Sequence, residues 1–169
     1  MVKLDLMKDG GFEAPIKPSG SSTTYKAGLK IGPWSVTAGS VDLLNTVWQN
    51  AAGTQSIDLA GSKPGTITQT VTLPSSGTYT LGFKFAGNPG GAPVIKHMQV
   101  SAMAPTWGAR VSKSQAFSTS GKTRHAMGWK SGSLTFAGKA GNVVTITFHD
   151  TDTATAYGMA LDSVTLTLG

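Results

Sequence analysis

The sequence predicts an all-β protein: a two-sheet antiparallel β-sandwich with jelly-roll-like connections. Two observations carry this prediction. Short segments alternate apolar and polar residues with a period of two, and Gly, Pro, Ser and Asn bound most of them. No window of a dozen residues shows the 3.6-residue period of a helix. Because only one face of each segment is apolar, antiparallel strands with one buried face fit better than parallel strands.

Alternation is clearest in five segments that we expect to form strands. Within the first, Ile67, Val71 and Leu73 share a face with Gln69, and threonines occupy the other face. Three further strands are expected, which makes about eight to ten in all. The five clear segments are residues 65–73, 78–87, 94–103, 142–150 and 161–169, and the three further ones are 34–43, 55–60 and 129–136.

Three stretches lack alternation and are expected to be long loops: residues 14–33, 86–94 and 103–128. No linker divides the chain, and no repeat of fixed period is present, so residues 1–169 are expected to form a single domain.

Composition excludes several classes of protein. Only 13% of the residues are charged, and the chain has 22 Thr, 17 Ser and no Cys. The absence of cysteine rules out disulfide scaffolds, cysteine-ligated zinc fingers, iron–sulfur sites and cysteine catalysis. The formal net charge of +6 permits an acidic partner without specifying one.

The first fifteen residues contain no apolar core of a signal peptide, and no segment is apolar enough to span a membrane. Charges at Lys3, Asp5, Lys8 and Asp9 interrupt the N-terminal region. Two alternatives remain open. Either a signal was removed, or the protein is made in the cytoplasm and reaches its destination by another route, as virion proteins do.

Carboxylates are too few and too scattered to favour an enzyme. Glycoside hydrolysis usually needs two carboxylates beside the bond that breaks. Asp58 and Asp162 lie within strand patterns and are expected to be structural, whereas Asp150 and Asp152 lie in a turn. No nucleophile elbow, Walker loop or dinucleotide fingerprint is present, and the three histidines lack zinc-site spacing. We therefore expect no catalytic activity.

Aromatic residues in loop-like surroundings are the candidates for binding a sugar, because sugar rings stack on exposed indole and phenol rings. These candidates are Trp48, Trp107 and Tyr157, although any single Trp is more often a core residue or a loop anchor.

Amide side chains near these rings could form hydrogen bonds with sugar hydroxyl groups. Gln49 and Asn50 adjoin one candidate Trp, and Asn88 lies in the expected loop 86–94.

Basic residues are spread along the chain, with a modest cluster in its second half. They lack the concentrated charge and interleaved aromatic residues of a nucleic-acid binder, so no nucleic-acid partner is expected. Two alternatives remain, a solvated basic face and a surface for an anionic partner such as a polyuronate or an acidic protein shell. The cluster consists of Arg110, Lys113, Lys122, Arg124 and Lys130.

A series of short motifs runs in order through the chain. It begins with DGGFEAP and AGLKIGPWSVTAGSVDLL, continues with VWQNAAGTQSIDLAGSKPGTITQTV and TYTLGFKFAGNP, and ends with AYGMALDSVTLT. This series resembles the bacterial choice-of-anchor C family and related plant cell-wall proteins of unknown biochemical function. The resemblance covers residues from about 10 to the end and implies a galactose-binding-like β-sandwich, a scaffold of many non-catalytic carbohydrate-binding modules. It also implies core positions for Trp34 and Trp129.

The same resemblance implies a structural Ca²⁺ ion where the two chain ends meet, held by Glu13 of GGFE and Asp162 of ALDS. The alternative is that these carboxylates are satisfied by backbone N–H groups or by Lys.

The function expected from the sequence is a non-catalytic, surface-displayed module that recognises cell-surface or cell-wall carbohydrate. Its partner would be a polysaccharide or glycan, and its location extracellular or at the cell surface. The alternative is a structural or decoration protein on a virion surface or other assembly, with a capsid or similar partner and adhesion to host glycans as an additional role.

Overall fold

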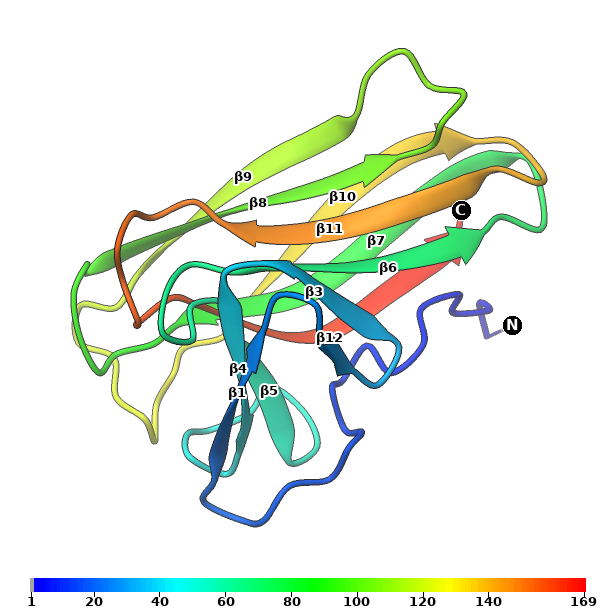
Figure 1. The fold of residues 1–169 in the computed structure, drawn as a ribbon. Coiled ribbons are helices and arrows are strands. Elements are labelled where there is room, and N and C mark those ends of the chain that lie inside the picture. The colour runs from blue at the N-terminus through cyan, green and yellow to red at the C-terminus, as the bar shows by residue number, and fades with distance from the viewer. Residues whose placement is uncertain (1) are drawn as a thin grey trace.

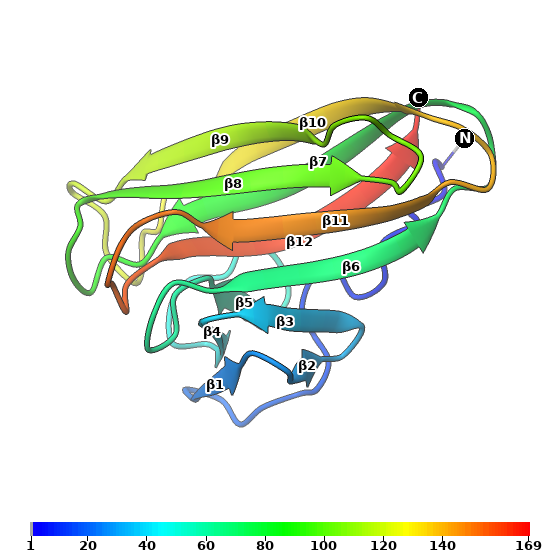
Figure 2. The same ribbon diagram turned by 45° about the horizontal axis from the view of Figure 1, so that its top comes forward.

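The computed structural model describes residues 2–169, which form twelve β-strands and no helix (Figures 1 and 2). The strands make two six-stranded sheets in which all paired strands are antiparallel. The predicted two-sheet β-sandwich is therefore confirmed. No helix of residues 2–169 could cross a membrane.

The first sheet has the strand order β1-β4-β5-β12-β7-β10, and the second has the order β2-β3-β6-β11-β8-β9. The strands of the first sheet are β1 (Ser22–Lys26), β4 (Ser40–Asn45), β5 (Gln55–Asp58), β12 (Met159–Leu168), β7 (Gly77–Gly87) and β10 (Lys130–Gly138). Those of the second are β2 (Lys30–Ile31), β3 (Trp34–Ala38), β6 (Thr66–Thr72), β11 (Val143–Asp150), β8 (Ile95–Met103) and β9 (Val111–Ser118).

The apolar faces of the predicted strands meet between the two sheets. In β6 the buried positions are Ile67, Gln69 and Val71, and the threonines between them point outward. In β7, Tyr79, Leu81, Phe83 and Phe85 are buried as the alternation predicts, and in β11 the same holds for Val144, Ile146 and Phe148. Burial of these residues removes apolar surface from water and is the main driving force for this fold.

Trp34 links the N-terminal segment to the core. Its side chain is fully buried, with ring centroids 5.3 Å from Phe12 and 6.1 Å from Phe148. Its indole Nε1 donates a hydrogen bond of 3.0 Å to the carbonyl oxygen of Asp9. Phe12 is thus packed, and Asp9 hydrogen-bonded, against the sandwich, and Trp34 is a core residue as expected.

The expectation of one strand over residues 34–43 is wrong, because the chain changes sheets at Gly39. β3 pairs with β6 in the second sheet, and β4 pairs with β1 and β5 in the first. Gly39 has a φ of +57°, and a Cβ atom there would lie 1.8 Å from the carbonyl oxygen of Pro64. Only glycine permits this corner.

Two of the expected long loops also contain strands, which is why the structure has more strands than expected. β1 and β2 lie within residues 14–33, and β9 lies within 103–128. β1, β2 and β9 are three of the four edge strands, the fourth being β10, and each of the three has at least half of its residues outside the core. Such strands are held by backbone pairing and not by an apolar face, so alternation does not reveal them.

We predict that replacing Trp34 by alanine lowers the free energy of unfolding by about 3–5 kcal/mol, because it leaves a cavity and removes an indole hydrogen bond. Thr135→Ala on the exposed face of β10 should change it by less than about 0.5 kcal/mol. Urea denaturation followed by tryptophan fluorescence and circular dichroism measures both. Equal losses in the two variants would contradict the central position of Trp34.

Candidate functional site

Gln49 joins two long loops at one end of the sandwich, the β4–β5 loop and the β9–β10 loop. Its backbone N–H donates to the carbonyl oxygen of Arg124 at 2.7 Å. Its side-chain Oε1 accepts the Met127 N–H at 3.0 Å, and its carbonyl oxygen accepts the Trp129 Nε1–H at 2.8 Å. These three bonds span 75 to 80 residues of sequence, so only the tertiary structure brings the two loops together.

The two loops border an open, solvent-facing cavity of about 560 Å³, called here the loop cavity. Lys84 of β7 belongs to its lining, and the indole of Trp129 is half-buried in its wall. This volume is typical of sites that hold small ligands, and a partly exposed indole is a suitable surface for stacking a sugar ring. The lining residues are Gln49, Asn50, Ala51, Lys84, His125, Ala126, Gly128 and Trp129.

The amide side chains of the loop cavity have their oxygens engaged and their nitrogens free. Gln49 Oε1 accepts from Met127, and Asn50 Oδ1 accepts the hydroxyl of Ser56 at 2.6 Å. Within residues 2–169, neither amide NH₂ group donates to a protein acceptor. Lys84 Nζ donates to Ser131 Oγ at 2.6 Å and is solvent-exposed. The cavity therefore offers several N–H donors to a ligand.

Of the six residues that the sequence singled out for binding, only Gln49 and Asn50 line this cavity. Trp48 is 4% exposed, and its Nε1 donates to Ser56 Oγ at 2.7 Å. It therefore anchors the β4–β5 loop to the core and has no open face for a sugar, which corrects its expected place among the exposed rings.

Trp107 lies at the other end of β7, beside a separate cavity of about 630 Å³ that Gly77 also lines. Its ring centroid is 5.5 Å from that of Phe136, and its Nε1 donates to Asn142 Oδ1 at 3.4 Å. Lys84 is seven residues along β7 from Gly77, roughly 23 Å in an extended strand. Trp107 and the loop cavity are therefore separate places on the molecule.

Asn88 and Tyr157 lie in a third place, where the β7–β8 and β11–β12 loops meet. Asn88 Nδ2 donates to Asp58 Oδ2 at 2.7 Å and its Oδ1 accepts the Gly90 N–H, so both ends of this amide are engaged. Tyr157 is 41% exposed, but one side of its ring lies against Gly91, where a Cβ atom would be 2.5 Å away.

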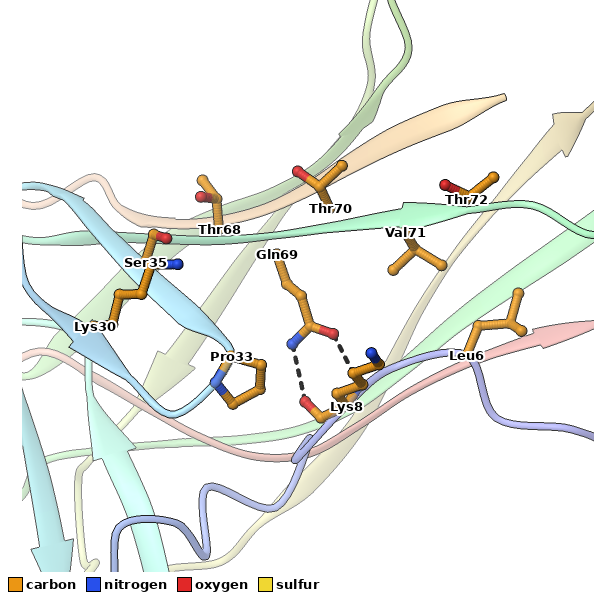
Figure 3. A pocket seen from close by; sticks show the side chains of 10 residues that line it. All are labelled: Leu6, Lys8, Lys30, Pro33, Ser35, Thr68, Gln69, Thr70, Val71 and Thr72. Carbon is orange, nitrogen blue, oxygen red and sulfur yellow. Dashed lines mark hydrogen bonds between the residues drawn. The ribbon is translucent and has the colours of Figure 1, made fainter. Parts of the chain in front are cut away.

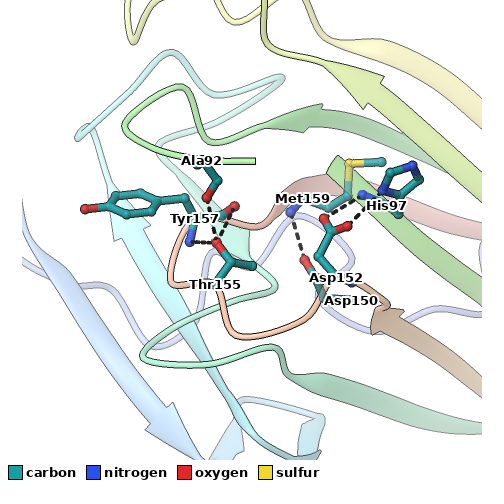
Figure 4. Close-up of polar contacts among 7 residues, drawn as sticks. All are labelled: Ala92, His97, Asp150, Asp152, Thr155, Tyr157 and Met159. Atoms are coloured by element: carbon teal, nitrogen blue, oxygen red, sulfur yellow. Dashed lines mark hydrogen bonds and ion pairs between the residues drawn. The ribbon is translucent and has the colours of Figure 1, made fainter. Parts of the chain in front are cut away.

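Hydrogen bonds between the same two loops hold this third place together (Figure 4). Thr155 Oγ1 donates to the carbonyl oxygen of Ala92 at 2.9 Å. Asp152 Oδ1 lies 2.8 Å from His97 Nδ1, within hydrogen-bonding distance. The carboxylate of the buried Asp150 accepts the Met159 N–H. The polar groups of this region are largely used in fixing its own backbone.

A further cavity of about 600 Å³ lies beside β6 and the N-terminal segment (Figure 3). Two hydrogen bonds join the Gln69 amide to the backbone N–H and carbonyl oxygen of Lys8, at 2.8 and 2.9 Å. Its lining contains threonines, lysines and aliphatic residues but no aromatic ring. This cavity therefore lacks the stacking surface that the loop cavity has.

Trp129, Lys84 and His125 are lining residues that sequence reasoning missed. Trp129 was expected in the core, and Lys84 simply occupies a polar position of an alternating strand. The one feature of the sequence that indicated this region was the basic cluster, because it contains Lys122, Arg124 and Lys130 in or beside the β9–β10 loop. The cluster does not include Lys84, the lysine that lines the cavity.

Glu13 and Asp162, the expected calcium ligands, both bind the backbone of the β4–β5 loop. Glu13 Oε1 accepts the N–H groups of Thr54 and Gln55 at 2.9 and 3.2 Å. Asp162 Oδ2 accepts those of Ala51 and Ala52 at 3.0 and 3.1 Å. The second oxygens accept from Thr54 Oγ1 and from the Ser163 N–H.

This arrangement does not fit a calcium site. Ca²⁺ requires six to eight oxygen ligands, whereas N–H or O–H donors point at all four carboxylate oxygens of Glu13 and Asp162. Residues 2–169 contain no group of three or more His, Asp or Glu side chains placed to hold a metal. The contacts match the alternative in which backbone N–H groups satisfy these carboxylates.

We predict that millimolar calcium and excess EDTA give the same melting curve, to within about 1 °C, because the carboxylate oxygens already accept N–H and O–H groups. Differential scanning calorimetry is the measurement. A calcium-dependent rise of several degrees would restore the calcium hypothesis, and Glu13→Gln would then have to abolish that rise.

Burial raises the pKa of Asp162 from its ordinary 3.8 to about 6, although N–H groups of Ala52, Ser163 and Ala51 oppose the shift. Between about pH 4 and pH 6 the folded protein then binds more protons at Asp162 than the unfolded chain does. The free energy of unfolding therefore contains a contribution that falls as pH rises through this window.

We predict that the difference in unfolding free energy, wild type minus Asp162→Asn, decreases between about pH 4 and pH 6 and is constant above about pH 7. Taking the difference cancels the titration of the other carboxylates. Urea denaturation at a series of pH values measures it. A difference that stays constant from about pH 4 to pH 8 would show that Asp162 has an ordinary pKa.

Solved structures of similar fold cover most of this chain. TmCBM61, in complex with β-1,4-galactotriose, has a TM-score of 0.61 at 15% identity over 98% of this chain and 99% of its own. A family 35 carbohydrate-binding module from Clostridium thermocellum has a TM-score of 0.56 at 19% identity, over 88% of this chain and 99% of its own. The CBM22-1 xylan-binding domain of Xyn10C from Paenibacillus barcinonensis has a TM-score of 0.56 at 15% identity, over 88% of this chain and 93% of its own. At these identities the likeness shows a shared fold.

Sequence comparisons give one curated relative and a family. Halomucin of Haloquadratum walsbyi is 34% identical over 89 residues, which are 50% of this chain but only 1% of halomucin's length. A family model matches residues 5–167, nearly the whole chain. The match does not confirm the choice-of-anchor C family of the sequence resemblance. The chain belongs to the family described as protein of unknown function (DUF642).

Proposed function

We propose that this protein is a non-catalytic carbohydrate-binding module and that the loop cavity is its ligand site. The observation that carries the proposal is the half-buried indole of Trp129 in a cavity that also contains the free amide NH₂ groups of Gln49 and Asn50. A ring for stacking together with a few fixed polar groups is the usual composition of a sugar site.

The fold supports the same proposal. The compared structures are carbohydrate-binding modules by their own descriptions, two of them named with galactotriose or xylan. Similar scaffolds serve many functions, so the argument for sugar binding here rests on the loop cavity and not on the fold.

The placement of the carboxylates supports a binding function without catalysis. A glycosidase needs two carboxyl groups facing the substrate. Asp58 and Asp162 are each no more than 1% exposed and accept backbone N–H groups, and the lining of the loop cavity contains no Asp or Glu. A sugar held in the loop cavity would therefore meet no carboxyl group suited to acid–base chemistry.

We predict that Trp129→Ala weakens polysaccharide binding at least about tenfold, because the stacking surface is lost. Trp107→Ala is the matched control, since it removes an indole that lines a different cavity at the other end of β7. Affinity gel electrophoresis against a panel of plant and bacterial polysaccharides measures both variants. Unchanged binding in Trp129→Ala, or an equal loss in Trp107→Ala, would contradict the assignment of the site.

We further propose that the protein is displayed outside the cell, at a wall or another surface. A cell-wall glycan would be the natural partner of a protein so placed, and no contact described above favours the decoration-protein alternative. Antibody labelling of intact cells of the source organism tests it, because a protein confined to the cell interior would not be labelled.

A further inference from the structure

The side-chain amides and the lysine of the loop cavity offer it hydrogen-bond donors and no free side-chain oxygen. The side-chain oxygens of Gln49 and Asn50 are engaged with the protein, whereas their NH₂ groups have no acceptor in residues 2–169. Lys84 contributes an exposed ammonium group. The lining contains no Asp or Glu, so no carboxylate competes for these donors.

The distribution of charge over the whole molecule also favours an anionic ligand. Asp58, Asp150 and Asp162 are buried and accept backbone N–H groups. Within residues 2–169 the one ion pair of 4 Å or less joins His97 to Asp152, so no Lys or Arg side chain is paired with an Asp or Glu side chain. Apart from the buried Lys96 and the half-buried Lys17, the Lys and Arg side chains are exposed, and their field attracts anionic ligands.

Two of these cations lie at the loop cavity. Lys84 lines it, and the side chain of Lys122 lies against Gly128, where a Cβ atom would be 2.8 Å from Lys122 Cε. Asp162 is the nearby carboxylate. It is fully buried, and its Oδ2 is capped by the N–H groups of Ala51 and Ala52.

We propose that the loop cavity takes an acidic saccharide, a sugar unit that carries a carboxylate or sulfate group, with its ring on Trp129 and its anionic group on Lys84 and the free amides. This inference rests on the proposed function and names its class of ligand. A carboxylate or sulfate only accepts hydrogen bonds and so matches a set of donors. A neutral sugar hydroxyl both donates and accepts, and the amide side chains of this lining have no free oxygen to accept its proton.

The test compares polymers that share a backbone and differ in charge. Polygalacturonate is paired with its methyl-esterified form, and dextran sulfate with dextran. Isothermal titration calorimetry of the whole protein is expected to show at least about tenfold tighter binding to the charged member of one pair or both, and weaker binding as salt rises. The pair that shows the preference identifies carboxylate or sulfate as the recognised group.

Two charge-matched variants separate a specific site from general attraction. Lys84→Gln should weaken binding to the preferred acidic polymer about five- to tenfold, which is more than it weakens binding to the neutral counterpart. Lys26→Gln removes the same charge from β1, the far edge of the same sheet, and should have little effect. Both side chains are exposed, and melting curves verify that each variant folds.

Three outcomes would overturn the inference: equal affinity for the charged and neutral members of both pairs, equal losses in Lys84→Gln and Lys26→Gln, or duplex DNA bound as tightly as the acidic polymer. The first outcome, combined with a loss of binding in Trp129→Ala, would leave the proposed function intact and refute only the preference for acidic sugars. Binding to none of the polymers would refute both.

Discussion

Hydrogen bonds from backbone N–H groups to a small number of carboxylates hold the loops of this protein in place. A chain without helices leaves many loop N–H groups outside the β-ladders, and such groups must find acceptors when they are buried. Glu13 and Asp162 accept four N–H groups of the β4–β5 loop, and Asp58 accepts those of Ala60 and Gly158. The loop cavity depends on this bonding, because Asn50 and Ala51 line it from the loop that Glu13 and Asp162 hold.

The same bonds account for the charge on the surface. A carboxylate that accepts backbone N–H groups inside the protein is not available to pair with a lysine outside it. Composition alone shows eight acids against fourteen bases, but the structure makes the surface more cationic than this ratio, because Asp58, Asp150 and Asp162 are buried. The donor-rich lining of the loop cavity follows from this division, and it is the reason for expecting an acidic ligand there.

Sequence reasoning succeeded for strands whose two faces differ strongly. In β6, β7 and β11 the alternating residues are buried as predicted, because the pleat of a strand assigns successive side chains to opposite faces. It failed for the edge strands β1, β2 and β9, which have little apolar pattern, and at Gly39, where one continuous pattern divides between two sheets. For the site it found Gln49 and Asn50, but it placed the buried Trp48 among the exposed rings. It expected Trp129 in the core and did not reveal that this indole, which packs against the core, also lines the loop cavity, because the exposure of an indole depends on which distant residues cover it.

The sequence by itself determined the all-β class, the inward faces of the central strands, the lack of cysteine chemistry and the scarcity of acids, because each depends on residue type or on near neighbours in the chain. Only the tertiary structure decided that Gln49 joins two loops 75 to 80 residues apart, that Lys84 and Trp129 share a cavity, and that Glu13 and Asp162 bind loop N–H groups. These contacts depend on which strands become neighbours in a sheet, and that pairing depends on long-range packing of apolar faces, which no local pattern encodes.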